Sequence, residues 1–293
     1  MDNAALTAYR AGMTFARALP EPVAQGMGKL LGPALAAGMP SRRRMIERHL
    51  ARAVGRPLGS LEKRRLVNAA FDSYARYWVE SFRLPDTTPE ELDAGMSYEG
   101  IGNIADALSL GGGAILALPH LGGWDFGGAW LATQGFPITV VVEPLDPPEM
   151  FEWFAAFRRS IGLTVVPLGP EATPAVLRAL KANQLVGLLC DRDVGASGVE
   201  VEFFGERTTL PAGPVTLGLR TGVPVLPTAV YFREGGGHHG VVRPPLPLER
   251  RGKLRADVAV GAQLLAHELE ALIRAEPTQW HLMQPNWPSD FVE

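Results

Sequence analysis

The chain has 293 residues, of which 46% are hydrophobic and one is cysteine, and its formal net charge is −3. This length and composition suit one large α/β domain, or one such domain with a helical addition. The single cysteine, Cys190, excludes a disulfide framework and indicates a reducing compartment. Because no signal-peptide pattern and no apolar run of about 18 residues occurs, we expect neither a leader nor a transmembrane helix.

Charge is distributed unevenly along the chain. Residues 1–83 hold 14 of the 28 Lys and Arg residues but only 6 of the 31 Asp and Glu residues. A basic N-terminal segment on an otherwise acidic chain indicates an anionic partner surface, either nucleic acid or a membrane leaflet. The helix expected after Ser41 is amphipathic and carries Arg42, Arg43 and Arg44, which favours the membrane surface. A solvated charged face is the alternative.

Residues 1–85 are predicted to form an N-terminal helical extension. Asp2–Leu19 keeps a helical period of apolar residues and ends at prolines. Val23–Met39 is apolar but interrupted by glycines and a proline, which indicates either a segment dipping into one leaflet or a short packed helix. Ser41 is predicted to cap a third helix. Leu61–Leu84 is predicted to form a fourth and longer one.

Residues 86–293 are predicted to form an α/β core that follows a linker at Pro85–Pro89. Short apolar runs alternate with helical patterns, which predicts a mostly parallel central sheet covered by helices on both faces. The predicted strands are Ala114–Leu118, Ile138–Val142, Leu163–Leu168, Leu185–Cys190, Val199–Phe204, Val223–Arg233 and His239–Val242. The predicted helices are Gly100–Leu110, Trp124–Gln134, Glu149–Ile161, Thr173–Asn183, Pro214–Thr221 and Asp257–Ala275.

The stretch Gly111–Trp130 contains a glycine-lined corner between a predicted strand and a helix. His120 follows the strand, and Asp125 lies in the first turn of the helix. Chemistry in open α/β sheets gathers at the carboxyl ends of strands. We therefore expect Asp125 to fold back onto His120, which would fix its tautomer and leave the other ring nitrogen as a base. Free N–H groups at Gly122–Trp124 are expected to hold an oxyanion. A packed histidine and a first-turn carboxylate are the alternative.

Two further predicted strands end in ionisable side chains. Glu143 follows one of them, Asp191 and Arg192 follow the other, and Arg158 lies on a helix between them. Parallel strands bring their carboxyl ends to one edge of a sheet, so we expect these groups to collect around His120. Arg158 is expected to pair with Glu143 or with an anionic substrate.

These motifs resemble a known family. Leu-Pro-His-Leu-Gly-Gly-Trp-Asp at 118–125, with its His-x4-Asp spacing, is similar to the signature of the glycerolipid acyltransferase superfamily. The surrounding residues resemble the branch that contains lipid A and phosphatidylinositol mannoside acyltransferases. The end of the chain, Trp280–Trp287, is more similar to the mannoside enzymes because it lacks a basic pair. Other matching stretches are Tyr74–Trp78, Asp191–Asp193, Val201–Gly205 and Pro211–Pro214.

The resemblance implies a peripheral membrane acyltransferase at the cytoplasmic face of the cell membrane. It implies transfer of a fatty acyl chain such as palmitoyl from acyl-CoA to a glycolipid hydroxyl, most closely a mannose of a phosphatidylinositol mannoside. His120 would be the base and Asp125 its orienting acid, with no covalent intermediate, since no G-x-S-x-G elbow occurs. Acyl-CoA is then a co-substrate, and no cofactor, metal or nucleic acid is expected. The residues implied to bind substrate are Glu143, Arg158, Asp191 and Arg192.

Three other functions stay open from the residues alone. A hydrolase would use Cys190 as its nucleophile, although its strand context favours a buried, inert thiol. A lipid-binding protein would use the same apolar groove without catalysis. A metal-dependent phosphoesterase would need a cluster of histidines and carboxylates. The candidates for that cluster are His120, Asp125, Asp191, Asp193, and His238 and His239, which are predicted to lie in a glycine-rich hairpin turn.

Overall fold

The centre of the protein is a seven-stranded sheet with the order β1-β9-β8-β2-β5-β3-β4, seen in a computed structural model that describes residues 3–195 and 198–291. The strands pair in parallel, except that β8 and β9 form an antiparallel hairpin. The predicted mostly parallel sheet is therefore confirmed. The strands are β1 (Met96–Glu99), β2 (Ala114–Leu118), β3 (Ile138–Val142), β4 (Thr164–Pro167), β5 (Leu185–Leu189), β8 (Val225–Phe232) and β9 (His238–Val242).

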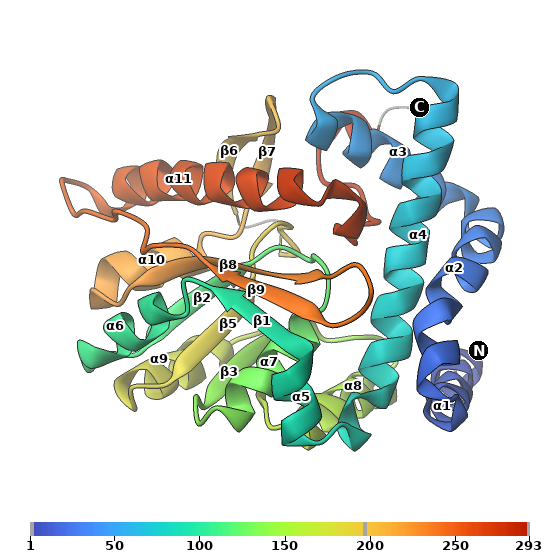
Figure 1. Ribbon diagram of the computed structural model, residues 1–293. Helices are drawn as coiled ribbons and strands as arrows, with labels where there is room; N and C mark the ends of the chain where they lie inside the picture. The colour runs from blue at the N-terminus through green and yellow to red at the C-terminus, as the bar shows by residue number, and fades with distance from the viewer. Residues whose placement is uncertain (1–2, 196–197, 292–293) are drawn as a thin grey trace.

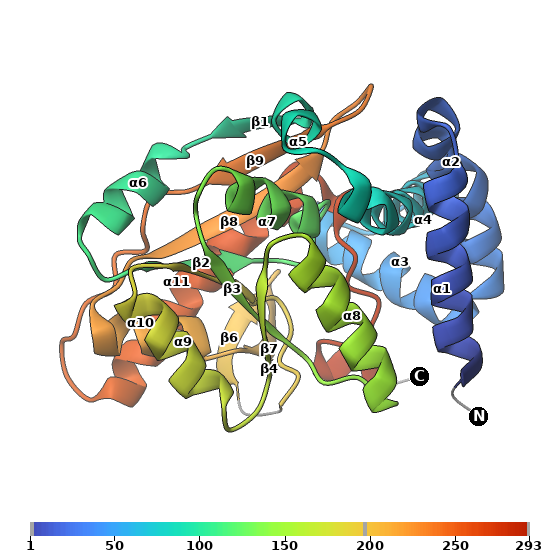
Figure 2. The same ribbon diagram turned by 90° about the horizontal axis from the view of Figure 1, so that it is seen from below.

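Helices cover both faces of this sheet (Figure 1, Figure 2). Successive residues of a strand point to opposite faces, so Leu116 packs with one set of helices and Ile115 with the other. The first set is α5 (Pro89–Gly95), α6 (Gly102–Ser109), α7 (Trp124–Thr133) and α8 (Pro148–Ser160). The second set is α9 (Ala172–Lys181), α10 (Gly213–Thr221) and α11 (Leu254–Ala275), with the hairpin of β6 (Val199–Phe203) and β7 (Glu206–Leu210) beside α11.

Four N-terminal helices stand together beside the sheet, in blue to cyan on the right of Figure 1. They are α1 (Asn3–Ala18), α2 (Glu21–Gly38), α3 (Pro40–Val54) and α4 (Ser60–Arg83), and the first three all pack against α4. The rings of Tyr9, Trp78 and Trp153 join α1 and α4 to α8 of the core. The predicted N-terminal helical segment is confirmed. Within the described part of the chain, no helix is both long and apolar enough to cross a bilayer.

The predicted linker Pro85–Pro89 joins α4 to α5 through a short 3-10 turn at Leu84–Asp86, and α5 begins with a capping box between Thr88 and Glu91. Two local expectations were wrong. Ser41 does not cap α3, because that helix already starts at Pro40, a residue favoured at a first helical position. His238 lies within β9 and pairs with β8 rather than occupying the hairpin turn.

Candidate active site

The corner after β2 is shaped by the main chain that packs around it. Gly122 has a φ of +61°, and a Cβ atom there would lie 2.0 Å from the carbonyl oxygen of Val230. A Cβ atom at Gly123 would lie 2.5 Å from the ring of His238. The two glycines are therefore required by β8 and β9, which approach the corner closely.

The backbone donors of this corner are already used. The Gly122 N–H donates to the carbonyl of Gln279 at 2.9 Å, and the Gly123 N–H donates to the carbonyl of Val230 at 2.9 Å. Donors that are paired with main-chain oxygens do not point at a reacting group. The expectation that N–H groups of this corner hold an oxyanion was therefore wrong for these two residues.

His120 is held by Asp191, which follows the neighbouring strand β5. The two nearest atoms, His120 Nδ1 and Asp191 Oδ1, are 2.7 Å apart, and the His120 backbone N–H donates to Asp191 Oδ2 at 3.0 Å. An imidazole that donates from Nδ1 to a carboxylate carries an unprotonated Nε2. The His120 side chain is 28% exposed, whereas that of Asp191 is fully buried. The buried Asp191 carboxylate therefore fixes the His120 ring and leaves its Nε2 atom accessible.

Asp191 keeps its charge although it is buried. Burial alone raises the pKa of a carboxyl group, but the adjacent His120 ring and the N–H donors of Trp280 and His120 outweigh that effect and lower the pKa of Asp191. Asp191 does not line the cavity described below. Its predicted role as a substrate-binding residue was therefore wrong, since it contacts the histidine instead.

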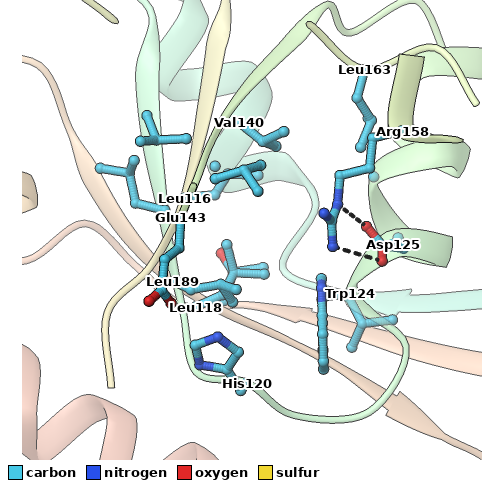
Figure 3. A pocket seen from close by; sticks show the side chains of 18 of the residues that line it. Leu116, Leu118, His120, Trp124, Asp125, Val140, Glu143, Arg158, Leu163 and Leu189 are labelled. Atoms are coloured by element: carbon cyan, nitrogen blue, oxygen red, sulfur yellow. Dashed lines mark hydrogen bonds and ion pairs between the residues drawn. The ribbon is translucent and has the colours of Figure 1, made fainter. Parts of the chain in front are cut away.

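Asp125 does not orient His120. The Asp125 carboxylate accepts hydrogen bonds from Arg158 Nε at 2.9 Å and Nη2 at 3.2 Å, and from the Tyr77 hydroxyl at 2.8 Å. Figure 3 shows the Trp124 side chain between His120 and this Asp125–Arg158 pair. The expected His120–Asp125 contact was wrong because the first turn of α7 directs Asp125 toward α8 and α4.

Asp125, Arg158 and Tyr77 form a buried charged cluster. Burial opposes the charge of Arg158, but the adjacent Asp125 carboxylate outweighs it and raises the pKa of the guanidinium. Burial, and then the neighbouring Asp125, raise the pKa of the Tyr77 hydroxyl, so it stays a neutral donor. Tyr77 also stacks on Trp124 at a ring distance of 4.2 Å. The cluster thus fixes the start of α7.

Glu143 and Arg192 lie at the same edge of the sheet as His120, as expected. Arg192 Nη1 is 3.3 Å from Glu143 Oε2, so each of these residues pairs with the other. Arg158 does not pair with Glu143, the first of its two expected partners, but it lines the cavity, and its contact with an anionic substrate stays a prediction. Both Glu143 and Arg192 line the cavity, with side chains 39% and 24% exposed, and remain available to a ligand.

His120 opens onto a cavity of about 910 Å³. Most of its floor is one face of the sheet, made of alternate residues from six strands that lie in register, and Val141 and Leu188 of the other face also line it. These residues are Met96 and Tyr98, Gly240 and Val242, Thr228 and Val230, Leu116 and Leu118, Gly187 and Leu189, and Val140 and Val142. Leu163 and the side chains of α7 form part of the opposite wall (Figure 3). The cavity is thus apolar along the sheet and polar at the edge that carries His120.

The cluster proposed for a metal is dispersed over separate interactions. Asp193 accepts from the Gly198 N–H and from Thr209, and His238 lies 2.9 Å from Glu80. Among residues 3–195 and 198–291, no group of three or more His, Cys, Asp or Glu side chains is placed to hold a metal ion. Cys190 is buried, and burial raises the pKa of its thiol, which disfavours a nucleophilic thiolate.

Comparison with known proteins places this chain in a family. The sequence model of the bacterial lipid A biosynthesis acyltransferases matches residues 3–289. The chain belongs to this acyltransferase family. A phosphatidylinositol mannoside acyltransferase of Mycolicibacterium smegmatis is 40% identical over 289 residues, which cover 97% of this chain and 92% of that protein.

Two further relatives show the breadth of the family. A phosphatidylinositol mannoside acyltransferase of Mycobacterium tuberculosis is 38% identical over 292 residues, covering 98% of this chain and 89% of that protein. A lipid A biosynthesis acyltransferase of Haemophilus influenzae is 24% identical over 225 residues, covering 75% of this chain and 67% of that protein. The resemblance found in the sequence is confirmed, and the chain is an acyltransferase by family.

Proposed function

We propose that this protein transfers a fatty acyl chain from acyl-CoA to a hydroxyl group of a glycolipid, with a mannose of a phosphatidylinositol mannoside as the acceptor. The observation that supports it most is the His120–Asp191 pair at the polar edge of a long apolar cavity. The relatives at 38% and 40% identity, named phosphatidylinositol mannoside acyltransferases, support the choice of acceptor.

His120 acts as a general base and then as a general acid. Its Nε2 takes the proton from the acceptor hydroxyl, and the oxygen attacks the thioester carbonyl carbon. The tetrahedral intermediate collapses, the carbon–sulfur bond breaks, and the thiolate leaves with the proton that His120 held. Asp191 stays ionised throughout and stabilises the imidazolium that forms between the two steps.

The sheet face supports the assignment of a long aliphatic chain to the cavity. Neighbouring strands lie about 4.8 Å apart, so a floor across six strands is about 24 Å wide. The residues that form it are mostly aliphatic, with Gly187 and Gly240 leaving two positions without side chains. An apolar chain gains free energy by leaving water for such a surface.

The N-terminal helices support attachment to an anionic membrane surface. Phe15, Val23 and Leu31 are exposed on α1 and α2. Arg42, Arg43 and Arg44 follow at the start of α3. Exposed apolar side chains next to a basic cluster are typical of helices that lie in the interface of a bilayer. Such attachment would bring a lipid acceptor to the cavity without a membrane-spanning segment.

The experiment that tests this function incubates the protein with palmitoyl-CoA and a phosphatidylinositol dimannoside, and detects acylated products by mass spectrometry. His120→Ala is expected to reduce product formation by about 10²- to 10⁴-fold, because the base is lost. His239→Ala is a matched control, since His239 bonds to Ser97 and does not line the cavity. Full activity of His120→Ala, or dependence on an added metal ion, would overturn the proposal.

A further inference from the structure

The chain segment after α11 contacts both members of the His120–Asp191 pair. The His281 backbone N–H donates to the carbonyl of His120 at 2.7 Å. The Trp280 indole Nε1–H donates to Asp191 Oδ2 at 2.7 Å, and Asn286 Nδ2 donates to the backbone carbonyl of Asp191 at 3.0 Å. Leu121 and Trp280 also form an antiparallel bridge. Residues far apart in the sequence therefore meet at the carboxylate.

We propose that Trp280 is a positioning residue, whose indole N–H holds the Asp191 carboxylate in the orientation that receives the Nδ1 proton of His120. The inference rests on the proposed role of His120 as general base. It assigns a function to a residue that touches neither substrate nor the reacting nitrogen.

The hydrogen-bond geometry of Asp191 supports this role. Oδ1 accepts from His120 Nδ1, while Oδ2 accepts from both Trp280 Nε1 and the His120 backbone N–H. With both oxygens occupied, the carboxylate cannot rotate without losing a hydrogen bond. Trp280 is 3% exposed and Asp191 is fully buried, so water does not replace a lost donor.

The Trp280 donor also moderates the charge that Asp191 presents to His120. A donor to one carboxylate oxygen draws negative charge toward itself and weakens the pull of the other oxygen on a cationic neighbour. Without it, Asp191 attracts the cationic form of the His120 ring more strongly. Loss of the donor should therefore change both the rate and its pH dependence.

Two titratable groups beside the pair have pKa values shifted out of the range of an enzyme assay. Burial, with a further contribution from His120, lowers the pKa of His281 to about 3. Burial raises the pKa of the Cys190 thiol. Arg192 is paired with Glu143 at the cavity edge. His49 packs against both Trp280 and Trp287, at ring distances of 5.3 and 5.2 Å, so it is common to the two variants compared below. A change in the acidic limb of the pH–rate profile that is confined to Trp280→Phe therefore reports on the His120–Asp191 pair.

Trp280→Phe tests the proposal, with Trp287→Phe as the matched control. Trp287 is also buried, and its Nε1–H donates to the carbonyl of Phe203 at 3.1 Å, away from Asp191. Both variants lose one indole N–H from the same aromatic cluster. In the acyl-transfer assay with palmitoyl-CoA, Trp280→Phe should lower kcat by roughly 10- to 100-fold. The acidic limb of the pH–rate profile of Trp280→Phe should shift to higher pH by about one unit, with KM little changed. Trp287→Phe should keep the wild-type pH profile.

The outcomes separate this inference from the proposed function. If wild type is active, His120→Ala is inactive and the two Phe variants share the wild-type pH profile, Trp280 has no positioning role. If His120→Ala is active, the proposed function itself fails. Combining Trp280→Phe with Asp191→Asn should bring little further loss, since both changes act on one unit.

A measurement on wild-type protein covers the case in which Trp280→Phe does not fold. The indole N–H proton of Trp280 should shift in NMR spectra as the His120–Asp191 pair takes up a proton, with a midpoint that matches the acidic limb. The indole proton of Trp287 should not follow that titration. A Trp280 resonance that is insensitive to pH across the limb would overturn the proposal.

Discussion

Buried charge at this site is arranged in two separate pairs with different physical roles. His120 lies at the cavity edge with Asp191 buried behind it, and the two are placed to move a proton. Asp125 and Arg158 also line the cavity, but Asp125 bonds to Arg158 and Tyr77 rather than to His120. The Asp125–Arg158 pair holds the first turn of α7 in place. Trp124 lies in that turn, and its ring is 5.7 Å from that of His120, so the position of His120 depends on the turn as well.

Breaking the second pair is expected to destabilise the fold. Arg158→Met leaves the Asp125 charge buried with only Tyr77 as a partner, which should lower the free energy of unfolding by about 3–5 kcal/mol. Tyr77→Phe removes one hydrogen bond to a charged group and should cost about 1.5–3 kcal/mol. Urea denaturation at pH 7 compares the two variants. Equal midpoints for Arg158→Met and wild type would show that the pair contributes nothing to stability.

The sequence located the residues of the site but not their pairing. His120 was predicted as the centre, and Glu143 and Arg192 were expected at the same edge, where they lie. Asp191 was assigned to substrate from the family resemblance, and the sequence could not show that β5, rather than the next strand along the chain, neighbours β2. Tyr77 and Trp280 were noted only within stretches that resemble the family, since a polar contact of an aromatic side chain leaves no pattern.

Among the elements, the N-terminal helices combine a packed and an exposed face. α4 carries the packed face, with Val67 and Phe71 fully buried. Exposed apolar side chains occur on α1 and α2, and the arginines at the start of α3 follow them in the chain. Arg43 pairs with Glu47 at 3.3 Å, so part of the basic charge is offset within α3 itself.

Vesicle binding tests the proposed membrane surface. Alanine at Arg42, Arg43 and Arg44 together should weaken binding to vesicles with anionic lipid, since each cation contributes about 1 kcal/mol near such a surface. The loss should be up to roughly 100-fold and should shrink at high salt. Alanine at Arg250 and Arg251 is the control, because these exposed residues pair with Asp257 and Glu249. Equal binding of the triple variant and wild type would exclude this surface.

The buried strands were the elements best predicted from sequence. Ala114–Leu118 and Ile138–Val142 match β2 and β3 residue for residue, because a buried parallel strand is a short apolar run bounded by turn residues. β7 was missed, since Glu206–Leu210 is largely polar and is stabilised by pairing with β6. β1 was missed because its four residues, Met96–Glu99, do not form an apolar run. It is an edge strand of the sheet and pairs with β9.

At the scale of the whole molecule, the segment after α11 is joined to α3 of the N-terminal helices. Asp290 accepts hydrogen bonds from the Asn286 and Trp287 N–H groups, and its carboxylate contacts His49 and Arg52 of α3. Burial tends to raise the pKa of Asp290, but these donors outweigh it and lower the pKa well below its usual range. The C-terminal residues are thereby tied to the N-terminal helices.

Asp290 should make stability depend on pH in the acid range. Its pKa is lower in the folded protein, so its contribution is complete above the unfolded value of about 3.9 and is lost as the pH falls through the folded value. Asp290→Asn should lower the free energy of unfolding by about 3–5 kcal/mol at pH 7. The difference in the free energy of unfolding between Asp290→Asn and wild type, measured by urea denaturation, should become smaller below about pH 4. The exposed Glu249→Gln should show neither effect. A difference independent of pH would contradict this account.

The position of Trp280 and Asn286 after α11 has a consequence for partial unfolding. All seven strands of the sheet are complete at Val242, and α11 ends at Ala275, so the donors to Asp191 lie in a segment that adds no strand to the sheet. A segment of this kind can open locally while the sheet stays folded. Mild denaturant should therefore remove the support of Asp191, and with it acyl transfer, before it melts the protein.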